Sequence, residues 1–177
     1  MRIVECEQGS SEWLELRRGV ITGTRIEQAF KNSDALRNKL IAEKMATFLE
    51  PQGSSKDIDR GHALEPMAKK EYEKQTGRSV QEVGFILHPD RDDVGLSPDG
   101  IINNGAMAIE VKSPNSQTHV EYMRSETVPK KYLFQHLGYF LNIPELESID
   151  FVSYDEMNEV KSVELLLEVA DSPHVAC

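Results

Sequence analysis

The turn signal Asn-Asn-Gly at residues 103–105 constrains the fold of this chain more than any other feature. Asn and Gly tolerate the positive φ angles that tight hairpin turns require. Short apolar segments lie on both sides of the turn, within residues 94–102 and 106–114, and Pro114 can end the second one. We therefore expect an antiparallel β-hairpin here.

Charged side chains occupy positions that this hairpin would bring together. Asp99 precedes the first strand, and Glu110 and Lys112 share one face of the second strand because side chains alternate along a strand. Two neighbouring carboxylates repel unless a cation compensates them, and Mg²⁺ prefers one or two carboxylates plus water and phosphate oxygens. With Lys112 as an adjacent positive charge, this set suits phosphodiester hydrolysis. Taken alone, Glu110 and Lys112 are better explained as a surface ion pair on an ordinary amphipathic hairpin.

Bulk composition limits the class of protein. The chain has 177 residues, of which 39% are hydrophobic and 28% charged, so we expect one globular domain spanning residues 1–177. No membrane span or secretory signal is evident, and two cysteines near opposite ends fit a reducing cytoplasm. The formal net charge of −10 argues against a general nucleic-acid coat protein but not against a nuclease. We expect salt-sensitive, metal-dependent engagement of DNA.

The other segments predict helices on both sides of a central sheet. Ser10 or Ser11, Thr22 and Ser33 are candidate N-caps. Helices are expected over residues 11–19, 22–30, 34–50, from Asp57 or Asp59 to about Gln75, 115–125 and 129–142, with a loop over 51–57. Further strands are expected over residues 79–88, 148–155 and 160–169. This order predicts an α/β or α+β domain with a central mixed β-sheet flanked by helices.

Two other segments carry candidate site residues. His62 and Glu65 lie three residues apart and so share one helix face, and Pro66 predicts a kink or a helix start near Glu65. Arg17 precedes a turn and Thr24 opens the next helix, an arrangement that suits a phosphate pocket. Each also fits an ordinary solvated side chain or helix cap.

Apolar spacing assigns several large side chains to the core. Trp13 is expected there, and so is one face of the helix over residues 34–50. That face consists of Leu36, Leu40, Ile41, Met45 and Phe48. Gln135 and Tyr139 lie four residues apart on one face of a later helix, where Gln135 could contact a phosphate or a water.

Five blocks in this order resemble the lambda-type exonuclease, or YqaJ-like viral recombinase, family of the PD-(D/E)XK nuclease superfamily. They are "EWLELRRGVITGT", "GHALEPMA", "SPDG" with "IEVKSP", "YLFQHLGYF" and "FVSYD". The family commonly has Ala-Ser where this chain has Gly23 and Thr24, and Thr24 keeps the hydroxyl. The resemblance implies a PD-(D/E)XK core and two-metal hydrolysis that depends on Mg²⁺, with Mn²⁺ as a substitute.

The resemblance also implies roles for the metal-side residues. Asp99 and Glu110 would bind metal, with the main-chain carbonyl of Val111 as a candidate ligand. Glu65 would contact metal through water or complete a second site. Lys112 would orient or deprotonate the attacking water and stabilise the developing charge.

The remaining implied roles concern the substrate and partners. Gln135 would help to place the water, and Arg17 and Thr24 would hold the terminal 5′ phosphate. The implied activity is a 5′→3′ exonuclease on linear double-stranded DNA that leaves 3′ single strands for a strand-annealing protein. A toroidal homotrimer is implied as well.

Three alternatives stay open. They are a RecB-like nuclease acting on single strands, a restriction-type endonuclease, and a catalytically silent module that binds DNA ends.

Overall fold

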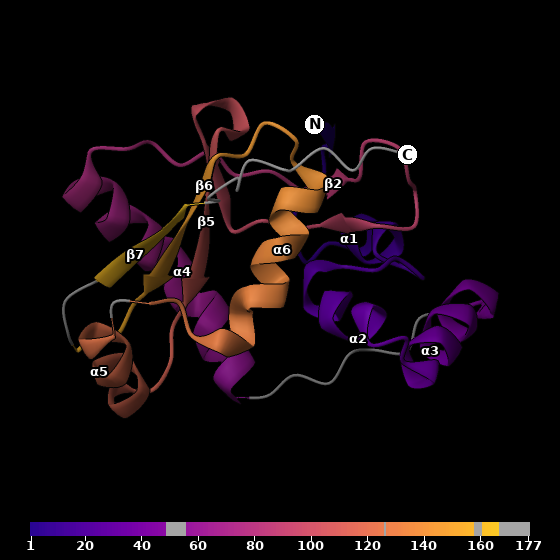
Figure 1. Cartoon of the computed structure of the whole chain (residues 1–177), viewed down its shortest axis with the longest axis horizontal. Coiled ribbons are helices and arrows are strands. Elements are labelled where there is room, and N and C mark those ends of the chain that lie inside the picture. Colours follow the sequence, from indigo (N-terminus) through magenta and orange to yellow (C-terminus); the bar gives the residue numbers. More distant parts are fainter. Residues whose placement is uncertain (49–55, 126, 158–160, 167–177) are drawn as a thin grey trace, which may run out of the picture.

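The computed structural model describes residues 1–48, 56–125, 127–157 and 161–166. Strands and helices of this part alternate irregularly along the chain (Figure 1). The strands are β1 (Arg2–Val4), β2 (Phe85–Leu87), β3 (Gly95–Leu96), β4 (Gly100–Ile102), β5 (Met107–Lys112), β6 (Ser148–Ser153) and β7 (Lys161–Leu166). The α-helices are α1 (Ser11–Leu16), α2 (Ile26–Phe30), α3 (Asp34–Met45), α4 (Lys56–Thr76), α5 (Ser116–Arg124) and α6 (Leu133–Asn142). Short 3₁₀ turns cover Gly23–Arg25, Asn103–Gly105 and Lys130–Tyr132.

The larger sheet has the strand order β4-β5-β6-β7. Strand β5 is antiparallel to β4 and parallel to β6, and β7 is antiparallel to β6. This is the mixed sheet flanked by helices that the sequence predicts. Its hairpin turn has positive φ at Asn103, Asn104 and Gly105, with values of 51°, 57° and 95°. The turn chemistry read from the sequence is therefore confirmed.

A separate three-stranded sheet, which the sequence does not predict, accompanies the central mixed sheet. Strands β1, β2 and β3 pair antiparallel. No strand is predicted from the sequence at the position of β1. The predicted strand over residues 79–88 is reduced to β2, and the one over 94–102 is broken into β3 and β4. Pro98 lies in the break, where it cannot donate a hydrogen bond to a strand ladder.

Helices α6 and α4 cover opposite faces of the larger sheet (Figure 1). Tyr139 of α6 and Ile143, directly after α6, pack with Ala108, and Leu64 and Ala68 of α4 pack on the other face. The side chains of Ile109 and Val111 in β5 point toward α4. Those of Glu110 and Lys112 point to the opposite face, on the side of α6. The predicted alternation along β5 is confirmed.

Helix α4 continues through Pro66, so of the two outcomes predicted near Glu65, a kink or a helix start, the helix start is wrong. Proline lacks the N–H that would bond to the carbonyl of residue 62, four positions earlier. The Pro66 ring is exposed beside the cleft described below, where the helix tolerates that loss. Thr76 is the last residue of α4, and Gly77, with φ of 69°, ends it as expected.

The N-terminal helices follow the expected capping only in part. Ser10 and Ser33 accept hydrogen bonds from Trp13 and Leu36 at the starts of α1 and α3. Thr22 makes no capping bond, because the chain enters a 3₁₀ turn there and the Thr22 hydroxyl is buried without a partner.

Helix α3 ends at Met45, earlier than predicted, and part of its apolar face is exposed. Leu36 is buried, whereas Ile41, Met45 and Phe48 are 50%, 80% and 84% exposed. In Figure 1, α3 lies at the edge of the molecule, away from both sheets. The predicted loop 51–57 falls outside the described residues up to residue 55, and residues 56 and 57 belong to α4.

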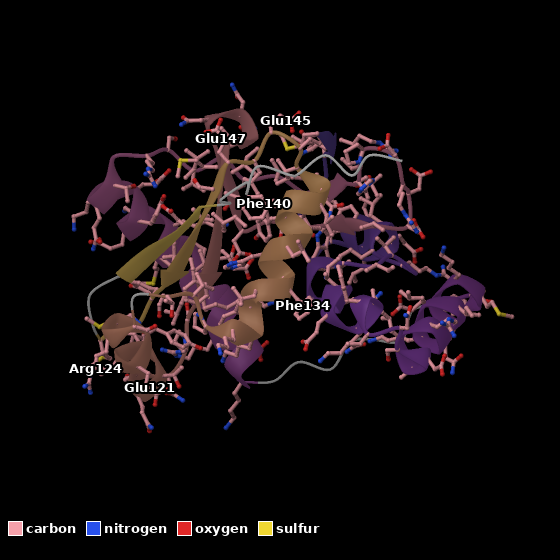
Figure 2. The ribbon with its side chains drawn as sticks, in the orientation of Figure 1. Glu121, Arg124, Phe134, Phe140, Glu145 and Glu147 are labelled. Carbon is pink, nitrogen blue, oxygen red and sulfur yellow. The ribbon has the colours of Figure 1, made fainter. Side chains whose placement is uncertain are left out.

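The later helices match their predicted positions closely. Asn115 caps α5 through a hydrogen bond from Thr118, and α6 follows a 3₁₀ turn that begins after Pro129. Phe134 and Phe140 project from α6 (Figure 2), and Phe134 lies 5.8 Å from the ring of Phe30 in α2. Within the described part of the chain, no helix is long and apolar enough to cross a membrane.

Candidate active site

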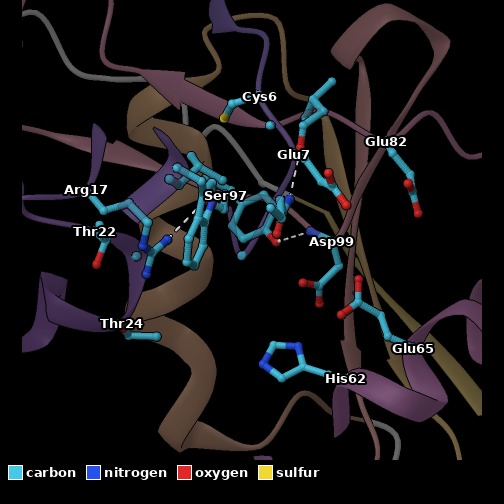
Figure 3. A pocket seen from close by; sticks show the side chains of 18 of the residues that line it. Cys6, Glu7, Arg17, Thr22, Thr24, His62, Glu65, Glu82, Ser97 and Asp99 are labelled. Atoms are coloured by element: carbon cyan, nitrogen blue, oxygen red, sulfur yellow. Dashed lines mark hydrogen bonds between the residues drawn. The ribbon is translucent and has the colours of Figure 1, made fainter. Parts of the chain in front are cut away.

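A cleft of about 910 Å³ lies where α1, α4, α6 and the break between β3 and β4 meet (Figure 3). Five of the predicted site residues line it: Arg17, Thr24, Glu65, Asp99 and Gln135. Glu110 and Lys112 lie behind this lining on β5 and reach the site through hydrogen bonds. Residues from six separate segments of the chain thus converge at one place.

Asp99 occupies the irregular link between β3 and β4. Its Oδ2 accepts a hydrogen bond of 2.6 Å from the main-chain N–H of Val111. Burial, followed by the charge of Glu110, raises the pKa of Asp99 well above its usual range, and Glu65 adds to the effect. The hairpin therefore places Asp99 beside Glu110, as the sequence predicts.

Glu110 is the most enclosed charged residue of the site, with 1% of its surface exposed. Its Oε1 accepts hydrogen bonds from Lys112 Nζ and, at 2.5 Å, from Gln135 Nε2. Its Oε2 accepts a hydrogen bond of 2.5 Å from the hydroxyl of Tyr139. A buried carboxylate needs such donors, because an unsatisfied charge in the interior is costly.

Lys112 is held as a cation next to these acids. Burial alone would lower its pKa, but the charges of Glu110 and Asp99 outweigh burial and raise the pKa above its usual value. The Nζ atom also lies 5.5 Å from the ring centre of Tyr132. A positive charge is therefore fixed beside the carboxylate pair.

The main-chain carbonyl of Val111 faces the β4 edge of β5. The Lys112 carbonyl accepts from Tyr154 N, on the β6 side of β5, and carbonyls of successive residues in a strand point to opposite edges. The Val111 carbonyl must then face the β4 side, as its N–H does when it binds Asp99. Both main-chain groups of Val111 are thus directed at the site.

Glu65 reaches the cleft from α4 (Figure 3). Its Oε1 lies 2.7 Å from Lys69 Nζ, which also lies 3.0 Å from Glu82 Oε1. His62 lines the same cleft one turn earlier and is exposed. The predicted shared face of His62 and Glu65 is found.

Arg17 and Thr24 form the opposite wall of the cleft. The Arg17 guanidinium donates to Ser97 Oγ at 3.0 Å and lies 4.1 Å above the ring of Trp13. Burial, together with the charge of Arg25, lowers the pKa of Arg17 to about 10. Thr24 is exposed at the cleft. This wall offers a cation and a hydroxyl to an anion.

Trp13 belongs to this wall and not to the core as predicted. Its Nε1 donates to Ser97 Oγ at 2.7 Å, and the ring lines the cleft. An indole N–H that must find a partner favours such a half-buried position over a purely apolar one.

A close approach between α6 and the 3₁₀ turn brings the two walls together. A Cβ atom at Gly138 would lie 3.3 Å from Gly23 Cα and 3.2 Å from Ile26 Cγ1. A Cβ at Gly23 would lie 3.5 Å from Gln135 Cγ, an ordinary contact. The alanine common in the family therefore fits at Gly23.

Three residues of the site were missed. Tyr139 had a signal in the Gln-x-x-x-Tyr spacing, Ser97 lies two residues before Asp99, and Lys69 lies four residues after Glu65 on α4. Only the helical spacings could have pointed to Tyr139 and Lys69. No local sequence pattern pointed to Ser97, because its hydrogen-bond partners Trp13 and Arg17 are far away in the chain.

The donor set fits a hard divalent cation. Asp99 and Glu110 supply carboxylate oxygens, and the Val111 carbonyl lies on the edge of β5 that faces β4. Burial, followed by repulsion from Glu110, raises the pKa of Asp99. Among the described residues, no group of three or more His, Cys, Asp or Glu side chains is already arranged to hold a metal ion. Two carboxylates with water and phosphate oxygens are the ligand set that Mg²⁺ prefers.

Comparison with known proteins gives the family. The family model described as YqaJ-like viral recombinase domain matches residues 12–141. The chain belongs to this family. The match runs from α1 to α6 and so includes every predicted site residue. No curated protein matches the chain.

Solved structures of exonucleases share the fold. An alkaline exonuclease from Laribacter hongkongensis is 29% identical, with a TM-score of 0.78 over 89% of this chain and 82% of that one. Its complex with dAMP, at the same identity and coverage, gives a TM-score of 0.79. A phage-related exonuclease from Haemophilus somnus 129PT, 14% identical, gives 0.57 over 83% and 84% of the two chains and supports the fold alone. Family and fold together place this chain among the phage-type exonucleases of PD-(D/E)XK type.

Proposed function

We propose that this protein is a Mg²⁺-dependent 5′→3′ exonuclease that acts on linear double-stranded DNA and leaves 3′ single strands. One observation carries the proposal: the cleft has a carboxylate wall and, facing it, a wall with Arg17 and Thr24. A nuclease that works from an end needs both a hydrolytic centre and a site for the terminal phosphate.

The carboxylate wall would hold the metal. Asp99 and Glu110 would be the ligands, with the Val111 carbonyl, and Mn²⁺ would substitute for Mg²⁺. When bound, the cation would polarise the scissile phosphate and offset charge on the leaving oxygen. Glu65, whose side chain lies next to Asp99 (Figure 3), would contribute through water or at a second site.

The protein's own groups would position the reactants. Lys112, held beside Glu110, would orient the attacking water and stabilise negative charge as it develops on the phosphate. Gln135 would help to place the same water, and its bond to Glu110 fixes the amide. Tyr139 would keep the Glu110 carboxylate in one orientation from the other side.

The 5′→3′ direction of digestion would be set by the wall that contains Arg17 and Thr24. A guanidinium without a carboxylate ion-pair partner in the described part of the chain is available to a terminal 5′ phosphate. A related exonuclease has been solved in complex with dAMP, which supports binding of a nucleotide by a protein of this fold.

The proposed setting is the cytoplasm of a bacterial host cell during phage-type recombination. The partners would be DNA ends, a single-strand annealing protein and two further copies of the chain in a ring. A ring would help a chain of net charge −10 to hold DNA, because it would enclose the duplex near its basic side chains.

Digestion of end-labelled duplexes with Mg²⁺ tests the proposal. The substrates are linear duplexes with a 5′ phosphate or a 5′ hydroxyl, beside a closed circle, with Asp99→Ala as the inactive control. Mononucleotides released from 5′-phosphorylated ends, with the circle intact, are expected. A cut circle would favour an endonuclease, preference for single strands a RecB-like enzyme, and binding without cleavage in Mg²⁺ or Mn²⁺ a silent end-binding module.

A further inference from the structure

An ion-pair chain of Glu65, Lys69 and Glu82 runs along the cleft beside the candidate metal ligands. The Lys69 side chain is only 13% exposed, although its partners Glu65 and Glu82 are 26% and 75% exposed. Its ammonium group lies 2.7 Å from Glu65 and 3.0 Å from Glu82. Lys69 thus has one anionic partner inside the site and one at the rim.

Both partners are held by the fold. Glu65 and Lys69 are four residues apart on α4, a spacing that places their side chains together on one face. Glu82 follows Gln81, whose main chain exchanges hydrogen bonds of 2.8 and 2.9 Å with Ile101 in β4. The ammonium therefore lies between a carboxylate on its own helix and one that projects from a segment whose main chain is fixed.

We propose that Lys69 is a positioning residue that competes with a divalent cation for Glu65, with Glu82 as the carboxylate that keeps the ammonium group when the cation binds. This inference rests on the proposed function, because it assumes a metal at Asp99 and Glu110. Glu65 cannot give the same oxygen fully to an ammonium group and to a cation. A cation that binds Glu65 through Oε1 displaces Lys69, and one that binds through Oε2 is repelled by the ammonium charge close by.

The competition separates two kinds of cation binding. Asp99 and Glu110 make no ion pair with Lys69, so cation binding that uses only these two carboxylates depends on Lys69 much less. Binding that also uses Glu65 is weakened by the ammonium group. The protein without DNA then holds one cation firmly and a second one weakly.

Mn²⁺ titration of the full-length protein without DNA tests this, with free Mn²⁺ measured by electron paramagnetic resonance. Lys69→Gln is expected to tighten the weaker class of sites by about threefold to tenfold, because it removes a competing ion pair that is partly buried. Glu82→Gln is expected to weaken that class, because Lys69 then pairs with Glu65 alone. Lys70→Gln and Glu71→Gln, which make the same charge changes at neighbouring positions of α4, serve as controls.

The double variant separates competition from simple charge effects. If Glu82 acts through Lys69, Glu82→Gln has little effect in the Lys69→Gln background, whereas independent charge effects add. Lys69→Arg, which keeps the positive charge of the side chain, should bind Mn²⁺ with wild-type affinity. Equal and additive shifts in the site variants and in the α4 controls would overturn the proposal.

Asp99→Asn distinguishes failure of this inference from failure of the proposed function. Loss of the tighter class in Asp99→Asn, with no change in Lys69→Gln, would leave the metal site standing and remove the competition. Wild-type protein that binds no Mn²⁺ at all would overturn both.

Discussion

The two walls of the cleft are built in opposite ways. On the wall of β5 and α6, Glu110 is 1% exposed and accepts hydrogen bonds from Lys112, Gln135 and Tyr139. On the wall of α1 and the following 3₁₀ turn, Arg17 rests on Trp13 and a neutral hydroxyl, and burial lowers its pKa to about 10. One wall has its charges compensated inside the protein, and the other has a cation that an external anion would stabilise.

This difference suggests a division of tasks. Charged groups that are already hydrogen-bonded inside the protein stay in place during the reaction, which suits stabilisation of the transition state. An uncompensated, partly buried guanidinium gains most when a phosphate arrives, which suits recognition of an end. Changes on the two walls should therefore affect different measurements.

The largest effect is expected from Lys112→Ala. Cleavage should fall by about 10³-fold or more on 5′-phosphorylated and 5′-hydroxyl ends alike, because a fixed charge beside the reacting phosphate is lost. Duplex binding in Ca²⁺, measured by fluorescence anisotropy, should remain near wild type. Lys130→Ala, an exposed cation before α6, is the control. Retained Mg²⁺-dependent cleavage would remove Lys112 from the chemistry.

Arg17→Ala should act on the other wall and depend on the end. Cleavage of 5′-phosphorylated duplexes is expected to fall by about tenfold to a hundredfold, since a charge-assisted hydrogen bond is lost. Ends with a 5′ hydroxyl should be affected much less. Arg18→Ala is a matched control, because Arg18 turns away to bond Glu15 and the carbonyl of Glu43. An equal loss on both kinds of end would contradict the division between the walls.

Tyr139→Phe tests how tightly the carboxylate wall is held. The change removes only the hydroxyl that bonds Glu110 Oε2, so that a buried carboxylate oxygen loses its donor. We expect cleavage to fall by about fivefold to twentyfold. Tyr154→Phe, on the α4 face of the sheet, should leave the rate unchanged. Cleavage at the wild-type rate in Tyr139→Phe would mean that Gln135 and Lys112 alone fix Glu110.

The smallest effect is expected from Glu43→Gln, which loosens only the phosphate wall. Glu43 bonds Arg25 and the N–H of Gly19, whose φ of 63° shapes the turn after Arg17. Burial opposes ionisation of Glu43, but the bonds from Arg25 and Gly19 outweigh it and lower its pKa. The wild type should be more stable by about 1 kcal/mol at pH 7.

That stability difference should depend on pH in one direction. A carboxyl group with a lowered pKa stabilises the fold above its unfolded pKa, and the contribution is lost as pH falls through the folded pKa. Urea unfolding of both proteins should therefore give curves that converge on the acid side of the usual glutamate pKa. A difference that stays constant down to pH 3 would show that the ionised carboxylate is not the cause.

Some of the site was readable from the sequence because it follows local rules. The Asn-Asn-Gly turn, the sharing of one face by Glu110 and Lys112, and the pairing of Asp99 with β5 depend on turn chemistry and on the two-residue period of a strand. The spacing of Gln135 and Tyr139 depends on the helical period in the same way. The motif order carried the family assignment.

Other features depended on neighbours that the local sequence does not specify. A three-residue edge strand such as β1 carries too little periodicity to be recognised, and the split into two sheets follows from where β2 and β3 find partners. The apolar spacing of α3 predicted a buried face, but the fold leaves Met45 and Phe48 exposed.

The sequence by itself therefore determined the hairpin, the order of the helices and of the strands in the larger sheet, and which side chains share a face, since each depends on residues close together in the chain. Only the tertiary structure decided that Trp13 supports Arg17, that Tyr139 holds Glu110, and that Lys69 lies between Glu65 and Glu82. The physical reason is that the hydrogen bonds of a buried charge are satisfied by whichever donors packing brings near, and those donors come from segments far apart in the chain.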